Sequence, residues 1–443
     1  MLHLALPVII AEIGWITMGI VDTIIVGPLG PAAIGAVGAG SILFFAVMVL
    51  GMGTLFALDA FVAQSFGAGR VDECHRWLFA GLQLALVMSV VLVGVGLAGV
   101  ALLPRARLHP DVIGLLQPYL QALMWSAPPL MIFTVFRRYL QAMNIVGPVT
   151  LAVLAANVVN AVGNWIFVYG KLGAPALGVV GSAYATLGAR LFLALALFAV
   201  ILHRERGRPS GLHDVPFALD VTRVWHLLRL GAPTAVQITL EVGVFALASA
   251  LAGQIDPMAL AANQIVLNIA GFLFMIPLGF NSAAAVRVGQ AVGRGDPAGV
   301  RAAGWTALAL TGGLAIATSA VIALVPGPFL RIFTSEPSVI EVGAVLLLFY
   351  AVCQPFDGFQ SVATGALRGL GETRAPMIAN FIGHWLVGLP LGYTLCFTRG
   401  WGVVGLWAGL TFGLFLVGFT LLIVWQRRSR VFSFPPPHPS AVP

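Results

Sequence analysis

The sequence predicts an all-α membrane protein with twelve transmembrane helices in two pseudo-symmetric six-helix lobes. Three observations support this prediction. First, 59% of the 443 residues are hydrophobic and only 9% are charged, whereas soluble domains carry about 25% charged residues. Second, apolar stretches long enough to cross a bilayer, which takes ~20 residues, follow one another along the chain. Third, the two halves of the chain repeat.

Hydropathy places the spans and the connections between them. The predicted spans are residues 4–27, 32–62, 76–103, 112–136, 147–170, 178–202, 226–253, 258–288, 302–325, 338–366, 376–398 and 402–426. One longer polar connection divides them into two groups of six. We therefore expect an N-terminal lobe over 1–203, a cytoplasmic inter-lobe linker over 204–225, a C-terminal lobe over 226–428, and a disordered cytoplasmic tail over 429–443.

The basic residues indicate how the chain is oriented in the membrane. They are almost all arginines, and they concentrate in the even-numbered connections and after the last span. The positive-inside rule then predicts a multi-pass protein of the inner (plasma) membrane with both termini in the cytoplasm. The high isoelectric point, about 9.9, reflects this topology, so we expect the bilayer as a partner and no nucleic acid.

The repeat appears as a constant offset over the first two spans of each half and the loop that follows, and later in each half Gly178-Val179-Val180-Gly181 recurs as Gly402-Val403-Val404-Gly405 at a slightly different offset. The first offset aligns Pro7 with Pro233, Gly53 with Gly279, and the stretch 64–69 with 290–295. Six spans per repeat bring both halves into the membrane from the same side, so the repeats should be parallel, related by an axis along the membrane normal. Substrate sites of such proteins lie near the midplane, which indicates a transporter.

Acidic side chains inside the predicted spans are the first functional candidates, because a charged group in the bilayer is costly. Arg190 is the only clear basic residue inside a predicted span, so we expect that internal ion pairs cannot neutralise all the acids. Protons, water or bound cations would then balance them, which suits cation-coupled transport of a cationic substrate. A wet position near the headgroups remains an alternative for Asp22, and a structural role remains open for Asp59. The acids are Glu12, Asp22, Asp59, Glu241 and Asp357.

Two pairs of amides are spaced to share one helix face. Asn160 and Asn164 could coordinate Na⁺ beside a carboxylate or hydrogen-bond a protonated acid, but asparagine also ties helices together in membranes. Gln264 and Asn268 show the same spacing and the same ambiguity.

Two prolines are possible hinges. Pro7 and Pro233 each lie in a predicted span, where proline removes a backbone hydrogen bond and permits a kink. Either proline could instead sit in the first turn of its helix and only start it.

Enzyme signatures are absent from the sequence. It contains no Walker loop, no His/Cys metal spacing and no Gly-x-Ser-x-Gly elbow, and its three cysteines suggest no disulfide framework. We expect neither an enzyme nor a cofactor, so the energy for transport would come from an ion gradient. A membrane-embedded carboxylate enzyme is the alternative from another class.

Four motifs resemble the MATE multidrug and toxic compound extrusion transporters, and the chain looks most like their NorM branch. They are Leu6-Pro7-Val8 with Gly19-Ile20-Val21-Asp22-Thr23, the stretches 62–69 and 286–293, and the stretch 365–373. The resemblance implies an antiporter that exports cationic amphiphilic molecules in exchange for Na⁺ or H⁺ and works as a monomer. A lipid-linked precursor flippase of the same superfold is the alternative, but its anionic substrate would call for basic residues in the cavity.

The resemblance also implies two sites. By position, Asp22, Asn160 and Asn164 would form an N-lobe ion or proton site, while Glu241 and Asp357 would form a C-lobe site for cation and drug. Na⁺ is possible at either. Cys353 stands where NorM-like proteins often carry tyrosine, which weakens the transfer of Na⁺ coordination to the C-lobe. Glu12 has no clear counterpart in the family motifs, and with Gln264 and Asn268 it is a possible cavity-lining residue.

Overall fold

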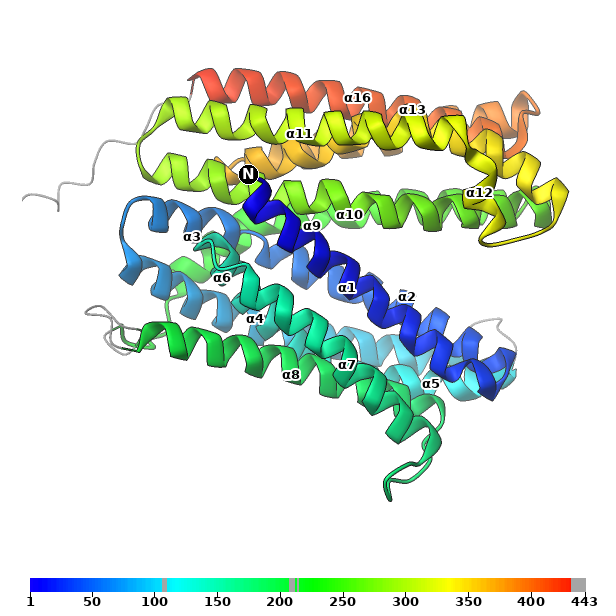
Figure 1. Cartoon of the computed structure of the whole chain (residues 1–443), viewed down its shortest axis with the longest axis horizontal. Helices are drawn as coiled ribbons and strands as arrows, with labels where there is room; N and C mark the ends of the chain where they lie inside the picture. The colour runs from blue at the N-terminus through cyan, green and yellow to red at the C-terminus, as the bar shows by residue number, and fades with distance from the viewer. Residues whose placement is uncertain (106–109, 207–211, 213–214, 432–443) are drawn as a thin grey trace, which may run out of the picture. The chain divides into compact units, whose positions relative to one another are not determined.

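The computed structural model describes residues 1–105, 110–206, 212 and 215–431. Within these residues the regular structure is entirely helical (Figure 1). Eleven helical segments are long and apolar enough to cross a membrane, and there are twelve if the bent pair α5 (Pro110–Met124) and α6 (Ala127–Ala142) counts as one span. That pair bends by 46°. The predicted all-α membrane fold is therefore confirmed.

The helices follow the predicted spans closely. In chain order the remaining ones are α1 (Leu2–Val26), α2 (Pro31–Leu55), α3 (Leu58–Gly67), α4 (Val71–Leu102), α7 (Gly147–Tyr169), α8 (Val179–Glu205), α9 (Val221–Ala252), α10 (Pro257–Gly293), α11 (Pro297–Leu324), α12 (Pro326–Arg331), α13 (Pro337–Gly369), α14 (Arg374–Asn380), α15 (Leu389–Tyr393) and α16 (Gly402–Val431). Two π-helical segments, Phe381–Gly388 and Thr394–Thr398, complete the span that begins with α14.

Several helix ends follow from local chemistry. The carboxylate of Asp256 accepts a hydrogen bond from the Ala259 N–H at 2.7 Å and so caps α10, which supplies a partner for an otherwise unpaired donor of the first turn. Gly69 and Gly295, which correspond in the repeat, both follow a helix end with positive φ, +74° and +70°. Glycine adopts this backbone conformation without strain.

The chain divides into two compact units. The first contains Leu2–Val62 and Val71–Gly243, and the second contains Met1, Ala63–Arg70 and the chain from Val244 onward. In the first unit, α7 lies between α1 and α8 (Figure 1). In the second unit, α13 packs against α10, α11 and α16. The lobe and linker boundaries expected from the sequence stay a prediction, and residues 432–443 of the expected tail lie outside the described residues.

The repeat is visible within the second unit as a reciprocal contact. A Cβ on Gly67 would clash with the backbone of Gln290, and a Cβ on Gly293 would clash with the backbone of Gln64. Since Gln64 and Gly67 correspond to Gln290 and Gly293, each repeat places its glycine on the other's glutamine. Only glycine permits so close an approach at these two positions.

Candidate ion-coupling site

Asp22 is the centre of a buried polar cluster formed by α1, α7 and α8. Its side chain lies near the C-terminal end of α1, and the residue is only 6% exposed. Asn164 Nδ2 donates to one carboxylate oxygen at 2.7 Å, and Thr186 Oγ1 donates to the other at 3.0 Å. Asn160 Nδ2 in turn donates to Thr186 Oγ1 at 3.4 Å. The structure thus brings together the three residues predicted for this site.

Thr186 is the member of the cluster that the sequence analysis missed. It lies one helical turn before Arg190 on α8, so the two share a helix face. Arg190 is the only arginine deep inside a predicted span, so its position was a usable signal for this face. The alternative that Asp22 is merely wet does not hold, because protein surrounds it.

The cluster offers oxygen atoms to a proton or a hard cation. Within the described residues, Asn160 Oδ1 and Asn164 Oδ1 are buried and accept no hydrogen bond, and they lie on the two amides beside the Asp22 carboxylate. Carboxylate, amide and hydroxyl oxygens are ligands that hard cations prefer. The residues present therefore fit Na⁺, and they equally fit a protonated acid.

Arg190 supplies a positive charge near Asp22 but forms no ion pair with it in the part of the chain that the structure describes. Its guanidinium donates to Ser126 Oγ and lies over the rings of Phe44, at 4.3 Å from the centroid, and of Trp15, at 5.8 Å. Arg190 and Asp22 interact electrostatically, but within the described part of the chain no ion pair joins them. The Asp22 carboxylate is thus held by neutral donors, and its neutralisation breaks no ion pair.

Two other acids are neutralised by internal ion pairs. Arg137 donates to Glu12 Oε1, and Arg138 Nη1 lies 3.2 Å from Asp59 Oδ2. Both arginines fall in a predicted connection, but α6 continues to Ala142 and they are buried. The expectation that intramembrane bases are nearly absent was therefore wrong. Glu12 and Asp59 are members of internal ion pairs.

The acids of the second half are placed differently. Asp357 is half-buried on α13, and no side chain in the described residues donates a hydrogen bond to its carboxylate. Cys353, one turn earlier, is buried and donates to the Tyr350 carbonyl at 3.3 Å. Glu241 is half-buried on α9 and belongs to the first compact unit, whereas Asp357 belongs to the second. The predicted C-lobe site remains a prediction.

The repeat gives Asp22 and Thr186 no polar counterparts. The offset between Pro7 and Pro233 pairs Asp22 with Ala248, and the offset between Gly181 and Gly405 pairs Thr186 with Leu410. Ala248 and Leu410 are buried in one apolar cluster with Val244. The two halves therefore share a helical framework, but only the first half places a carboxylate at this level.

The amide candidates on α10 do not occupy a buried polar position of that helix. Gln264 and Asn268 are exposed on α10, and the buried amide of that helix is Asn263, which accepts from Trp407 Nε1 at 3.0 Å and donates to Ser249 Oγ at 3.1 Å. No group of three potential metal-binding side chains of His, Cys, Asp or Glu occurs among the described residues.

Both candidate hinge prolines lie inside helices. Pro7 is in the second turn of α1, and Pro233 is far inside α9. Neither therefore only starts its helix. A hinge role remains a prediction.

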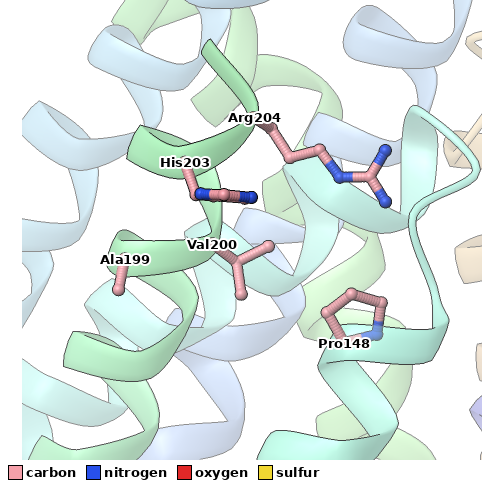
Figure 2. A pocket seen from close by; sticks show the side chains of 5 residues that line it. All are labelled: Pro148, Ala199, Val200, His203 and Arg204. Atoms are coloured by element: carbon pink, nitrogen blue, oxygen red, sulfur yellow. The ribbon is translucent and has the colours of Figure 1, made fainter. Parts of the chain in front are cut away.

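A cavity of about 680 Å³ lies at the other end of α7 (Figure 2). It is bounded by the start of α7 and the last turns of α8, and it contains no predicted site residue. Its lining residues are Pro148, Ala199, Val200, His203 and Arg204.

The fold and this site define a multi-pass membrane transporter. The family model described as MatE matches residues 7–166 and 233–394, and the chain belongs to this family. It is 36% identical over 437 residues to a probable multidrug resistance protein NorM from Mesorhizobium japonicum, with 97% of this chain and 94% of the relative covered. It is 31% identical to the multidrug resistance protein MdtK from Edwardsiella ictaluri, with 97% and 95% covered.

Solved structures show the same fold. The crystal structure of MATE in complex with MaL6 has a TM-score of 0.88 at 20% identity, covering 97% of this chain and 95% of that one. The crystal structure of the eukaryotic MATE transporter AtDTX14 has a TM-score of 0.85 at 21% identity, covering 97% and 96%. The chain is therefore an efflux transporter of the multidrug-resistance type and not an enzyme.

Proposed function

We propose that this transporter is a secondary antiporter that exports cationic amphiphilic molecules in exchange for Na⁺ or H⁺, with Asp22 as the coupling carboxylate. One observation carries the proposal: Asp22 is buried, and the side chains that hydrogen-bond its oxygens within the described residues, Asn164 and Thr186 with Asn160 beside them, are all neutral. If an arginine were paired with the Asp22 carboxylate, its charge would already be neutralised, as the charge of Glu12 is by Arg137. Asp22 instead keeps a charge that a proton or Na⁺ can cancel.

The second part of the proposal concerns the exported molecule. We assign Glu241 and Asp357 to its binding. For Glu241 the reason is the resemblance to NorM-like proteins, which implies a carboxylate of this site at that position. For Asp357 the reason is that a half-buried carboxylate that accepts no side-chain hydrogen bond attracts cations, while apolar surroundings favour the hydrophobic part of the molecule. Asp357 meets this description among the described residues. An anionic substrate, as a flippase would carry, is disfavoured because Arg137 and Arg138 are each paired with a carboxylate.

The proposal extends to topology. We place both termini in the cytoplasm of the inner membrane, with lobes over 1–203 and 226–428 and a linker over 204–225, and we assign function to the monomer. The concentration of arginines on the even-numbered connections supports this orientation.

Transport by purified protein in liposomes tests the function. A Na⁺ gradient and a pH gradient are imposed separately, and uptake of a fluorescent organic cation is followed. We expect uptake with one of the two gradients and its loss when an ionophore collapses that gradient. Uptake that continues without any gradient contradicts antiport. Asp357→Asn should weaken equilibrium binding of the cation, while Asp72→Asn, at an exposed position, serves as the matched control.

A further inference from the structure

A ladder of hydrogen bonds joins α1 to α7 along most of their length. In every rung the donor is a side chain of α7 and the acceptor is an oxygen of α1. The rungs are Thr150 Oγ1 to the Pro7 carbonyl at 2.8 Å, Asn157 Nδ2 to the Gly14 carbonyl at 2.9 Å, Asn164 Nδ2 to Asp22 Oδ1 at 2.7 Å, and the Tyr169 hydroxyl to the Ile25 carbonyl.

The spacing of the rungs shows a regular seam. Thr150, Asn157 and Asn164 recur at every seventh residue of α7, and a period of seven residues, about two turns, keeps side chains on one face of a helix. The partners on α1 keep nearly the same sequence separation from their donors in every rung. The two helices are therefore parallel and in register.

The donors are fixed in position by their own helix. Asn157 and Asn164 each also donate to a backbone carbonyl one turn earlier on α7, at 2.9 Å and 3.0 Å. The single hydroxyl hydrogen of Thr150 is shared between the Pro7 carbonyl and the carbonyl of Val146, the residue before α7, at 3.2 Å. Such a back-bond holds the side chain in one orientation. The donors that meet α1 are thus held by contacts within α7 as well as by α1.

Gly14 allows the helices to approach closely at the second rung. A Cβ at this position would lie 3.0 Å from Val153 Cγ1 and 3.5 Å from Asn157 Nδ2. Small residues at helix interfaces in membranes allow such packing.

Only one rung can respond to the coupling ion. The acceptors from Pro7, Gly14 and Ile25 are backbone carbonyls, which neither take up a proton at physiological pH nor lose their bond when Asp22 is neutralised. Asp22 is the single acidic acceptor, and its second oxygen bonds Thr186 on α8.

We propose that Thr150, Asn157 and Tyr169 are positioning residues that hold α1 on α7 throughout the transport cycle. The two helices then move as one pair, and a change at Asp22 is transmitted to Thr186 on α8 instead of separating α1 from α7. This inference rests on the proposed role of Asp22 as the coupling carboxylate.

A cross-link between α1 and α7 tests the inference. In a background with Cys74, Cys353 and Cys396 replaced by alanine, Gly14→Cys and Val153→Cys are introduced. A Cβ at position 14 would lie 3.0 Å from Val153 Cγ1, and a disulfide needs two side chains in such close contact. We expect the oxidised transporter to keep at least about half of the efflux rate of its reduced form. A twofold loss corresponds to the free energy of about one weak hydrogen bond, which is less than a forced change in helix separation would cost. Greater loss that a reductant restores overturns the inference.

Variants of the rungs provide a second measurement that does not depend on the cysteine background. Asn157→Ala and Tyr169→Phe should shift the coupling-ion concentration for half-maximal efflux by about two- to tenfold, the value of one net hydrogen bond. Thr150→Ser should behave as wild type. Thr17→Val is the matched control, because this hydroxyl bonds only the Ile13 carbonyl of its own helix.

The outcomes separate the two proposals. An unchanged ion dependence in both Asn157→Ala and Tyr169→Phe contradicts their positioning role, even if Asp22 is the coupling carboxylate. Normal gradient-driven efflux by an Asp22→Asn transporter contradicts the proposed function, whatever the cross-link does.

Discussion

Breaking the buried ion pair between Glu12 and Arg137 is expected to destabilise the transporter strongly. Glu12→Gln removes the charge that neutralises Arg137, whose side chain is only 7% exposed. Arg137 Nε is buried and donates no hydrogen bond within the described residues, so little else compensates the guanidinium. Removing one partner of a buried pair costs ~3–5 kcal/mol.

The double variant Glu12→Gln with Arg137→Met separates the charge effect from the loss of packing. Removing both charges of a buried ion pair leaves no uncompensated charge and so costs less than removing one. The double variant should therefore recover most of the stability lost in Glu12→Gln. The assay is the free energy of unfolding in mixed micelles with increasing SDS. Arg428→Gln is the control, because Arg428 pairs with Glu372 at 2.9 Å but is 62% exposed, and such pairs contribute ~0–1 kcal/mol. A cost for Glu12→Gln as small as that of the control would refute the reasoning.

Three further predictions concern other parts of the molecule. Gly293→Ala should destabilise the second unit by about 1–3 kcal/mol, measured in the same unfolding assay, because its Cβ would clash with the backbone of Gln64, whereas Gly94→Ala has open space and should be neutral. Thr186→Val should reduce gradient-driven efflux in liposomes more than Thr186→Ser, because only serine keeps a hydroxyl for Asp22; equal rates would contradict the assigned hydrogen bond. The backbone N–H of Arg223 donates to Asp220 and holds the pKa of that carboxyl below its ordinary value. The ionised carboxylate therefore stabilises the folded segment before α9 at pH values above the ordinary pKa of aspartate. This stabilisation is lost as the pH falls through the lowered pKa. Limited proteolysis of the segment before α9 should accordingly be faster in acid, and Asp220→Asn should remove that dependence.

The helical framework could be predicted from hydropathy because the membrane demands long apolar segments. Hydropathy could not predict the breaks within a span. Residues 112–136 read as one stretch, yet the chain bends between α5 and α6 and the helix runs on to Ala142. Hydropathy places arginines in connections, so it misassigned Arg137 and Arg138. Their cost in the interior is offset by Glu12 and Asp59, which are distant in sequence.

The candidate site could be predicted where local spacing carried the signal. Asn160 and Asn164 share a helix face, and Asp22 interrupts an apolar stretch, so each stands out alone. Thr186 does not, since a threonine in a span is common and often bonds its own backbone. Its role depends on the packing of α8 beside α1 and α7, which is a tertiary property.

The central claim is that Asp22 couples the ion gradient to efflux. The most direct measurement is the ion flux evoked by the exported cation, followed with a dye sealed inside liposomes that contain wild-type or Asp22→Asn transporter. We expect wild type to exchange Na⁺ or H⁺ for the cation, and Asp22→Asn to bind the cation but evoke no ion flux. An Asp22→Asn transporter that exchanges ions at the wild-type rate would contradict the account.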